Sequence, residues 1–328
     1  MLKPKVFVTR RIFPEALDMI AAKTDMELWE DELPPPKDIL LEKVKDCQGI
    51  LSLLTDELDT EFFKTAKHLR VVSQIAVGYD NIDIEEATRR LIPIGHTPHV
   101  LNAATADMAF LLMMASSRRL VESQTFVKEG GWKTWHPMHF LGPNVSGATL
   151  GIVGMGRIGL EMATRARGFD MEVLYTDPNR RSLEDEQKYN LKYQDLDELL
   201  TKSDFISLHV NLTPKTHHLI SKREFQLMKP TAVLVNTARG SIVDHAALYN
   251  SLKKGDFFAA GIDVTDPEPL QKDDPLLSLD NCIVVPHIAS ASFSSRLDMS
   301  KLAAWNLLAG LNGETLPNCA NPGVYELN

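Results

Sequence analysis

Short apolar runs alternate with amphipathic helical stretches along the first hundred residues. Runs typical of buried strands lie at 6–9, 26–29, 49–53, 71–76 and 92–94, and helical stretches lie at 14–22, 37–45, 60–65 and 84–90. Strands that alternate with helices indicate a parallel sheet covered on both faces. The pattern therefore predicts a first α/β unit that runs to about His99.

Residues 103–128 are mostly apolar and predict one long helix that leaves this unit and enters another. The next span, GGWKTWHPMHFLGPN from Gly130 to Asn144, is irregular and holds two of the four tryptophans. One interpretation is a loop that packs over the core. The other is a loop that closes a site or contacts a partner subunit.

A second alternating series follows. It predicts strands at 150–153, 171–175, 205–209, 232–236, 259–264 and 282–285, and helices at 158–167, 196–200, 222–226 and 245–252. We expect a doubly wound parallel sheet of six or seven strands. Residues 290–311 are helical again and would cross back to the first unit.

The first strand of this series leads into Gly154-Met155-Gly156-Arg157-Ile158-Gly159, the GxGxxG spacing. Gly154 allows a tight turn, Gly156 lets a pyrophosphate approach the backbone, and Gly159 lets helix and strand pack closely. The helix N-terminus offers free N–H groups to phosphates. Asp177 ends the following strand and can accept hydrogen bonds from an adenosine ribose. The order strand, glycines, helix, strand, acid predicts nucleotide binding.

Composition narrows the class of protein. The chain has 328 residues, enough for two domains, and a net charge of -9, which argues against a nucleic-acid surface. Three cysteines without metal spacing fit a reducing cytoplasm. The first ten residues show no signal peptide, and the most apolar run, 106–115, is too short to span a membrane. We expect a cytoplasmic protein without a metal and without nucleic-acid or membrane partners.

Three segments that contain candidate catalytic residues follow strands of the second series. Ligands bind at the carboxyl ends of the strands in open α/β sheets. They contain Arg239 in TARG, Glu268 in DPEP and His287 in PHIAS. Each residue alone is more often structural. Together they supply the groups that reduction of a keto acid needs. A histidine that is active near neutral pH donates the proton, and a nearby carboxylate favours the protonated form of that histidine. An arginine binds the carboxylate of the substrate.

The other groups of polar residues give weaker evidence for a functional site. His217-His218 lacks metal-ligand spacing, Ser241 and Ser290 lack a GxSxG elbow, and no Walker loop is present. Metal and hydrolase functions are therefore disfavoured.

Several segments resemble the D-isomer-specific 2-hydroxyacid dehydrogenases, most closely the glyoxylate/hydroxypyruvate reductase branch. They are VGYDNID from Val77, NAATADMAF from Asn102, GMGRIG, TARGSIVD, GIDVTDPEPL, PHIASAS and NLLAGLNGE from Asn306. They span nearly the whole chain.

The resemblance implies two doubly wound parallel-sheet domains. A flavodoxin-like substrate domain would comprise residues 1–99 and 287–328, and a Rossmann cofactor domain residues 100–286. It also implies a homodimer formed through the cofactor domain.

The family's catalytic residues correspond to Arg239, Glu268 and His287. Its substrate contacts correspond to Val77, Gly78, Arg239 and His287, with Leu54 (or Leu53) nearby. Its cofactor contacts correspond to Thr105, Gly154, Gly156, Arg157, Ile158, Gly159, Asp177, His209, Thr213, Thr237, Ala238, Arg239, Asp263, His287 and Ala289.

Three departures from the family pattern matter. An acid at 177 would repel a 2′-phosphate, which favours NAD(H), although Arg180 and Arg181 leave NADP(H) open. Asn211 replaces a usual proline and is expected to loosen the loop near the adenosine. His139 stands where relatives often carry a second tryptophan that reaches the partner's active site.

The expected function is therefore reduction of a small 2-keto acid, glyoxylate or hydroxypyruvate, to the D-2-hydroxy acid. Two alternatives stay open. The first is a dehydrogenase of another D-2-hydroxy acid such as D-lactate, D-glycerate or 3-phosphoglycerate. The second is an NADH-sensing binding protein like the corepressors that share this fold. A phosphite enzyme would carry a lysine near Val77, and a formate enzyme a glutamine in place of Glu268.

Overall fold

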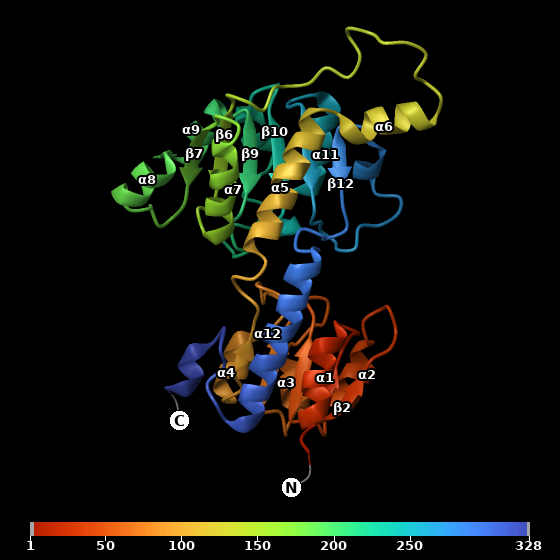
Figure 1. Cartoon of the computed structure of the whole chain (residues 1–328), viewed down its shortest axis with the longest axis vertical. Coiled ribbons are helices and arrows are strands. Elements are labelled where there is room, and N and C mark those ends of the chain that lie inside the picture. Colours follow the sequence, from red (N-terminus) through yellow and green to blue (C-terminus); the bar gives the residue numbers. More distant parts are fainter. Residues whose placement is uncertain (1–2, 327–328) are drawn as a thin grey trace. The chain divides into compact units, whose positions relative to one another are not determined.

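The computed structural model describes residues 3–326 and divides the chain into two compact units. One unit runs up to Leu101 and resumes at Ser292, and the other comprises Asn102–Ala291 (Figure 1). The predicted division lay at 99/100 and 286/287, and residues 1–2 and 327–328 of the predicted substrate domain lie outside the described residues.

The first unit is a five-stranded parallel sheet in the order β2-β1-β3-β4-β5. Helices α1 and α12 contact one another, and α12 also lies against β3 and β4. Phe62, Phe63 and Ile50 are among the fully buried side chains of its core. The elements are β1 (Lys5–Val8), α1 (Pro14–Lys23), β2 (Asp25–Leu28), α2 (Lys37–Val44), β3 (Gly49–Ser52), α3 (Thr60–Thr65), β4 (Val71–Gln74), α4 (Ile84–Arg89), β5 (Ile94–Gly95), α12 (Phe293–Asn312) and the 3-10 helix η3 (Pro322–Tyr325).

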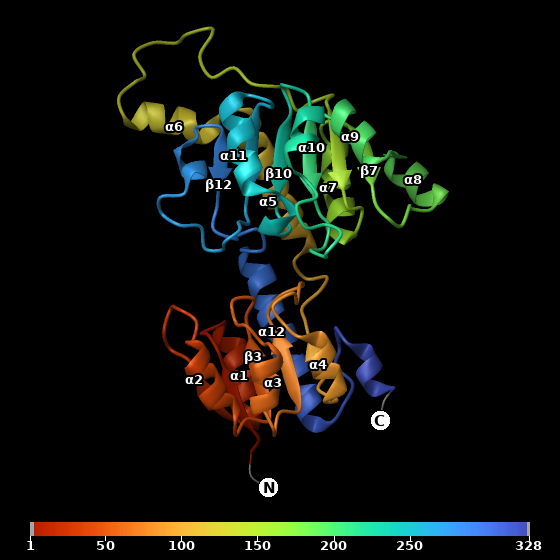
Figure 2. The ribbon, with the colours of Figure 1, turned by 180° about the vertical axis from the view of Figure 1, so that it is seen from behind.

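The second unit is a seven-stranded parallel sheet in the order β12-β11-β10-β9-β6-β7-β8. Helices α5 and α7 lie on one face, and Figure 2 shows α10 and α11 on the other. The elements are α5 (Asn102–Ser117), α6 (Leu120–Lys128), β6 (Thr149–Val153), α7 (Arg157–Arg167), β7 (Glu172–Thr176), α8 (Leu183–Tyr189), β8 (Leu191–Tyr193), α9 (Leu196–Lys202), β9 (Phe205–Leu208), α10 (Lys222–Leu227), β10 (Val233–Asn236), η1 (Gly240–Ile242), α11 (His245–Lys254), β11 (Ala259–Ile262), η2 (Pro275–Ser278) and β12 (Cys282–Val284).

These two orders confirm the predicted fold class, two doubly wound parallel-sheet domains. In the second sheet the strand order reverses between β6 and β9, and all the ladders are parallel. The carboxyl ends of six strands therefore lie along one edge. That edge carries Gly154, Asp177, His209, Thr237, Asp263 and the segment that leads to His287.

One predicted element is wrong. Residues 103–128 do not form one helix, because Arg119 adopts the left-handed conformation (φ 51°, ψ 39°) and separates α5 from α6. The Met114 carbonyl near the end of α5 accepts both from the Arg118 N–H at 3.0 Å and from the Ser117 hydroxyl at 2.9 Å. The backbone at Gly142 also packs so tightly on the Ser117 carbonyl that a Cβ there would lie 1.9 Å from it.

The tryptophan-bearing loop is exposed. Trp132 and Trp135 are 68% and 80% exposed, so the interpretation of a loop packed over the core is wrong. Helix α6 also buries no residue. Sequence analysis missed α8 and β8 as well, because their residues alternate little and α8 has no buried side chain.

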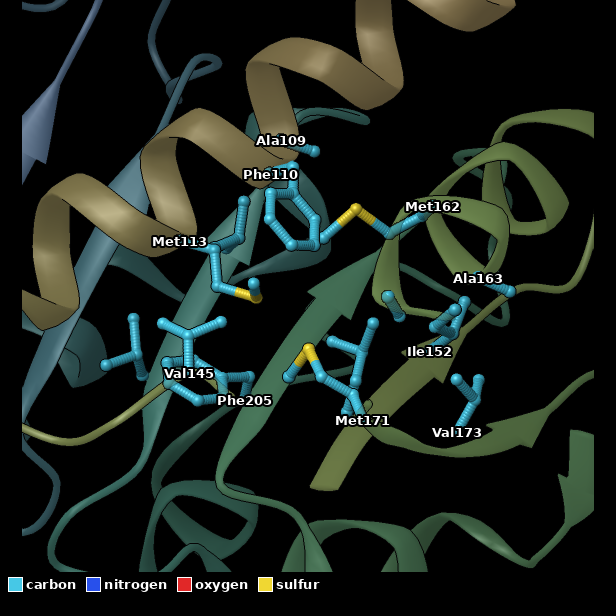
Figure 3. Close-up of a cluster of buried hydrophobic side chains, with 14 of the residues drawn as sticks. Ala109, Phe110, Met113, Val145, Ile152, Met162, Ala163, Met171, Val173 and Phe205 are labelled. Carbon is cyan, nitrogen blue, oxygen red and sulfur yellow. The ribbon is translucent and has the colours of Figure 1, made fainter. Parts of the chain in front are cut away.

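The core between α5, α7 and the second sheet is built from medium-sized apolar side chains. Figure 3 shows Met162 of α7 pointing toward Phe110 and Met113 of α5, with Ile152 and Val173 on the strands below. These side chains are at most 7% exposed.

We expect Met162→Ala to destabilise the protein by about 2–5 kcal/mol, because it removes a buried side chain and leaves a cavity. Thr164→Ala, two residues further along α7 with an exposed side chain, is the matched control and should change stability by less than about 0.5 kcal/mol. Urea unfolding followed by circular dichroism measures both. Equal losses in the two variants would contradict the assigned core face of α7.

Candidate functional site

The glycine-rich turn between β6 and α7 has the shape that a dinucleotide requires. Gly154 has φ +96°, and a Cβ there would lie 2.6 Å from the His209 carbonyl oxygen. A Cβ at Gly159 would lie 2.3 Å from the Gly154 oxygen, so this glycine lets α7 approach the strand. A Cβ at Gly156 would meet nothing within 4 Å. Space is therefore open in front of the α7 N-terminus, where Gly156 is the N-cap and has no capping side chain.

Asp177 is held in place beside this turn. Its Oδ2 accepts from the Met155 N–H at 2.8 Å, and its Oδ1 accepts from the Asn179 N–H at 2.8 Å. The carboxylate is half-buried, so it brings a fixed negative charge to the carboxyl end of β7.

The residues further along the edge also fit a bound dinucleotide. Thr237 follows β10, and its buried Oγ1 has no hydrogen-bond partner among residues 3–326. A buried hydroxyl without a partner is costly unless a ligand or water satisfies it. This hydroxyl and the space at Gly156 therefore both fit a nucleotide bound along this edge.

His287 and Glu268 form the closest charged contact of the site. His287 Nδ1 lies 2.5 Å from Glu268 Oε1, and the two side chains are 24% and 33% exposed. The other ring nitrogen of His287 is not used in this pair, so it can transfer a proton. Glu268 fixes the orientation of the ring in the way a carboxylate orients a catalytic histidine.

Asp263, at the end of β11, positions the His287 turn. Its carbonyl accepts from the His287 N–H at 2.9 Å, and its carboxylate accepts from the N–H groups of Ile288 (2.6 Å) and Ala289 (2.8 Å). His287 has φ 53°, an uncommon conformation for a residue with a side chain. Burial raises the pKa of Asp263, and the two backbone donors oppose that rise.

Arg239 follows β10 and begins η1. Asn236 braces this segment, because its Oδ1 accepts from the Ala238 N–H at 3.0 Å and its Nδ2 donates to the Arg239 carbonyl at 2.8 Å. The Arg239 side chain is half-buried, and its Nη1 donates to the Ala238 carbonyl at 2.8 Å.

The segment after Arg239 is also packed against the Glu268 loop. A Cβ at Gly240 would lie 2.0 Å from the Thr265 oxygen, and Ser241 donates to the Asp266 carboxylate. The segments of Arg239, Glu268 and His287 thus form one hydrogen-bonded group in the second unit.

Four supporting residues were missed by sequence analysis. Asn236 and Ser241 brace the arginine segment, and Gln74 and His96 brace a loop of the first unit described below. Asn236 carried a usable signal, since it is a polar residue that ends a buried strand.

The remaining predicted cofactor residues lie at the same edge or beside it. Arg157 and Ile158 form the first turn of α7, Thr105 is buried in the first turn of α5, and Ala289 is buried after His287. The His209 ring is directed to its own strand, with Nε2 2.8 Å from the Ser207 hydroxyl. The backbone of His209 lies against the glycine-rich turn.

Thr213 lies in a loop after β9 that is held together by its own hydrogen bonds. The Thr216 hydroxyl accepts from the Thr213 N–H at 2.8 Å and donates to the Asn211 carbonyl at 2.6 Å. These bonds restrain the loop that Asn211 was expected to loosen.

In the first unit, Val77 and Gly78 follow β4 in a braced loop. His96 Nδ1 lies 3.0 Å from the Val77 carbonyl, and Gln74 donates to the Gly78 carbonyl at 2.8 Å. Within residues 3–326 no acceptor is recorded for the N–H groups of Val77 and Gly78. Those two donors suit a carboxylate. Leu54 is half-buried after β3.

The described residues contain neither a metal-binding cluster nor a membrane-spanning helix. Among residues 3–326, no three His, Cys, Asp or Glu side chains gather in a way that could hold a metal ion. Within that same part of the chain, every helix is too short or too polar to cross a membrane.

Comparison with known proteins gives a consistent result. Residues 110–289 match the family model described as D-isomer specific 2-hydroxyacid dehydrogenase, NAD binding domain. The chain is 50% identical to the glyoxylate reductase of Korarchaeum cryptofilum, over 99% of this chain and 98% of that protein. It is 47% identical to the glyoxylate reductase of Thermococcus litoralis, over 98% of each. A solved structure of a Thermus thermophilus protein superposes with a TM-score of 0.91 at 42% identity, covering 96% of this chain and 99% of that one.

His209 makes stability depend on pH. Burial lowers the pKa of His209 to about 4, whereas a histidine of the unfolded chain titrates near 6.5. Between these two values the unfolded chain binds one proton more, so the folded state loses stability as the pH falls from 6.5. Because the side chain is only half-buried, solvent screens part of the effect, and we expect a loss of about 1 kcal/mol between pH 7 and 5.

His209→Gln should remove this loss, which urea unfolding at pH 7, 6 and 5 measures. His68→Gln, at an exposed histidine, is the control and should keep the wild-type slope. Identical slopes in wild type and His209→Gln would show that His209 is not the titrating group.

Proposed function

The chain belongs to the D-isomer specific 2-hydroxyacid dehydrogenase family, and from this premise we propose that it reduces glyoxylate to glycolate with a nicotinamide dinucleotide. The observation that carries the proposal is the 2.5 Å contact between His287 Nδ1 and Glu268 Oε1, on the sheet edge that also carries Arg239. The two named relatives, both glyoxylate reductases, support the choice of substrate.

The glycine-rich turn would hold the cofactor. Backbone N–H groups of the α7 N-terminus would bind its pyrophosphate in the space at Gly156, Asp177 would accept from the adenosine ribose, and Thr237 Oγ1 would gain a partner. When bound, a reduced nicotinamide supplies a hydride for the carbonyl carbon of the substrate.

His287 donates the proton that the carbonyl oxygen gains. Glu268 would accept from the His287 Nδ1–H and so fix the ring with its other nitrogen available for the transfer. Arg239 binds the substrate carboxylate and polarises the adjacent carbonyl with its positive charge. The N–H groups of Val77 and Gly78 are proposed as further carboxylate donors, with Leu54 contacting the substrate.

We propose NADH as the preferred reductant. Asp177 keeps a fixed negative charge where a 2′-phosphate would be bound, and both of its oxygens already accept backbone hydrogen bonds. A phosphate placed there meets like-charge repulsion. Hydroxypyruvate, with one more hydroxymethyl group than glyoxylate, is proposed as a second substrate.

The alternatives are less well supported. Reduction of another 2-keto acid uses the same three residues and differs only in the side-chain pocket. A sensor without turnover would keep the same dinucleotide site and could retain the same three residues, so the steady-state assay below distinguishes it from a reductase.

We expect rapid oxidation of NADH, and slower oxidation of NADPH, with glyoxylate and hydroxypyruvate, and weak activity with pyruvate. Steady-state absorbance at 340 nm measures all six pairs. His287→Ala should lower kcat by about 100-fold or more, while NADH affinity measured by fluorescence titration stays within about twofold. Clear NADH binding with no turnover of any substrate would support the sensor instead.

We also propose that the protein is a homodimer formed through the second unit. Helix α6 and the loop after it expose an unusual run of large apolar side chains: Leu120, Val121, Val127, Trp132, Trp135, Met138 and Leu141. Large apolar side chains exposed together on one segment are typical of an interface. A cavity of about 510 Å³ lies at the base of this segment beside Ser116, whose buried Oγ has no partner among the described residues.

We expect light scattering at micromolar protein concentration to give the molar mass of a dimer for the wild-type protein. Trp135→Glu should shift it toward monomer, since loss of an interface tryptophan costs about 2 kcal/mol or more, roughly 30-fold in dissociation constant. Trp305→Glu, at an exposed tryptophan of α12 in the first unit, is the matched control and should stay dimeric. A monomeric wild type, or dissociation of the control alone, would refute this interface.

A further inference from the structure

The segment that follows β5 contacts the loop that carries Val77 and Gly78. The Thr97 N–H donates to the Ala76 carbonyl at 2.8 Å, and His96 Nδ1 lies 3.0 Å from the Val77 carbonyl. A carbonyl oxygen can only accept, so this nitrogen of His96 carries a proton and donates it to the hydrogen bond. Two consecutive peptide groups of the loop are thus held by two consecutive residues.

These contacts set the direction of the two N–H groups proposed above as carboxylate donors. The carbonyl and the N–H of a trans peptide point in opposite directions, and the cis bonds among residues 3–326 all precede prolines of another loop. The N–H groups of Val77 and Gly78 therefore both point away from residues 96–97. A carbonyl that accepts a hydrogen bond also polarises the N–H of its own peptide, which makes that N–H a stronger donor.

The next carbonyl of the loop is held by a buried amide. Gln74 Nε2 donates to the Gly78 carbonyl at 2.8 Å. The fully buried Gln74 amide is itself paired with the Asn81 amide by two hydrogen bonds, of 2.8 and 3.0 Å. The loop thus has a rigid support after Gly78, and the His96 ring supplies the corresponding support at the Val77 carbonyl.

His96 is itself fixed in place. Its N–H donates to the Asn318 carbonyl at 3.2 Å, and its carbonyl accepts from Nδ2 of Asn306, a fully buried residue of α12, at 2.9 Å. Its ring meets the Tyr79 ring edge to face, with 5.6 Å between the centroids and an angle of 80° between the planes. A side chain held in this way can hold a binding group of the neighbouring loop in one orientation.

We propose that His96 is a positioning residue for the substrate. Its Nδ1–H orients and polarises the Val77–Gly78 peptide, and the Gly78 N–H then binds the substrate carboxylate more tightly. The inference rests on the proposed function, which assigns that carboxylate to this loop and to Arg239. Contacts with the carboxylate are equal in the ground state and the transition state, so their loss raises KM and leaves kcat unchanged, whereas a general loss of structure lowers kcat.

Three variants of the whole protein test this role. His96→Phe keeps a ring against Tyr79 but removes the donor. His96→Asn places an amide nitrogen where Nδ1 lies and is the rescue variant, and His68→Phe, at an exposed histidine of the same unit, is the matched control. KM and kcat are measured with glyoxylate at saturating NADH. Calorimetric titration with oxalate, a two-carbon carboxylate without a reducible keto group, measures binding with and without NADH and needs no turnover.

We expect His96→Phe to raise both the KM of glyoxylate and the Kd of oxalate by about five- to tenfold, the usual effect of losing one hydrogen bond. Its kcat and its NADH affinity should stay within about twofold of wild type. His96→Asn should return KM and Kd to within about twofold of wild type, and His68→Phe should change neither constant.

Unchanged KM and Kd in His96→Phe, a lower kcat at unchanged KM, or an Asn variant as impaired as the Phe variant would overturn the role of His96 alone. Wild-type protein that binds oxalate but does not reduce glyoxylate would overturn the proposed reaction, and the oxalate constants would then decide the role of His96. Wild-type protein that binds no oxalate, with or without NADH, would overturn the carboxylate site and the role of His96 together.

Discussion

The buried carboxylate of Asp263 is the contact on which the geometry of the site depends. Its oxygens accept from two successive N–H groups after His287, and its own carbonyl accepts from the His287 N–H. Those three bonds hold His287 in a left-handed conformation that the residue would otherwise avoid. With this turn in place the imidazole meets Glu268. Burying a carboxylate is costly, and here the backbone donors offset the cost.

The parallel sheet explains why a few hydrogen bonds are enough to position the residues of the site. Asp263, Arg239 and the His287 segment follow β11, β10 and β12, three adjacent strands whose register is set by their ladders. The side chains therefore need only local bracing, by Asn236 at the arginine and by Ser241 at the Asp266–Glu268 loop. A general acid, its carboxylate and an anion-binding arginine are thereby held on one rigid edge, which suits a reaction that relies on preorganised charge.

The sequence predicts the repeating architecture well, because periodic burial leaves a periodic pattern. Both sheets, the GxGxxG turn and the three chemical segments could be located that way. Features decided by contacts distant in the chain could not be. The break at Arg119 depends on how closely Gly142 packs on Ser117, and α8 is held by Tyr175 and a Ser182 cap rather than by an apolar face. Likewise, no pattern distinguishes Arg180, which is paired with Glu186, from Arg181, which donates to the Met155 carbonyl.

Helix α12 has a consequence for the order in which the chain folds during synthesis. Residues 293–312 cover β3 and β4 of a sheet whose strands are all made from the first hundred residues, and Gly310 packs so closely on Val71 that a Cβ would lie 2.5 Å from its side chain. The intervening unit, by contrast, is complete once residue 291 has been made. All residues of the second unit are therefore made before the helix that covers the apolar face of the earlier sheet. That face stays open to chaperones or to misassociation until residues 293–312 have been made.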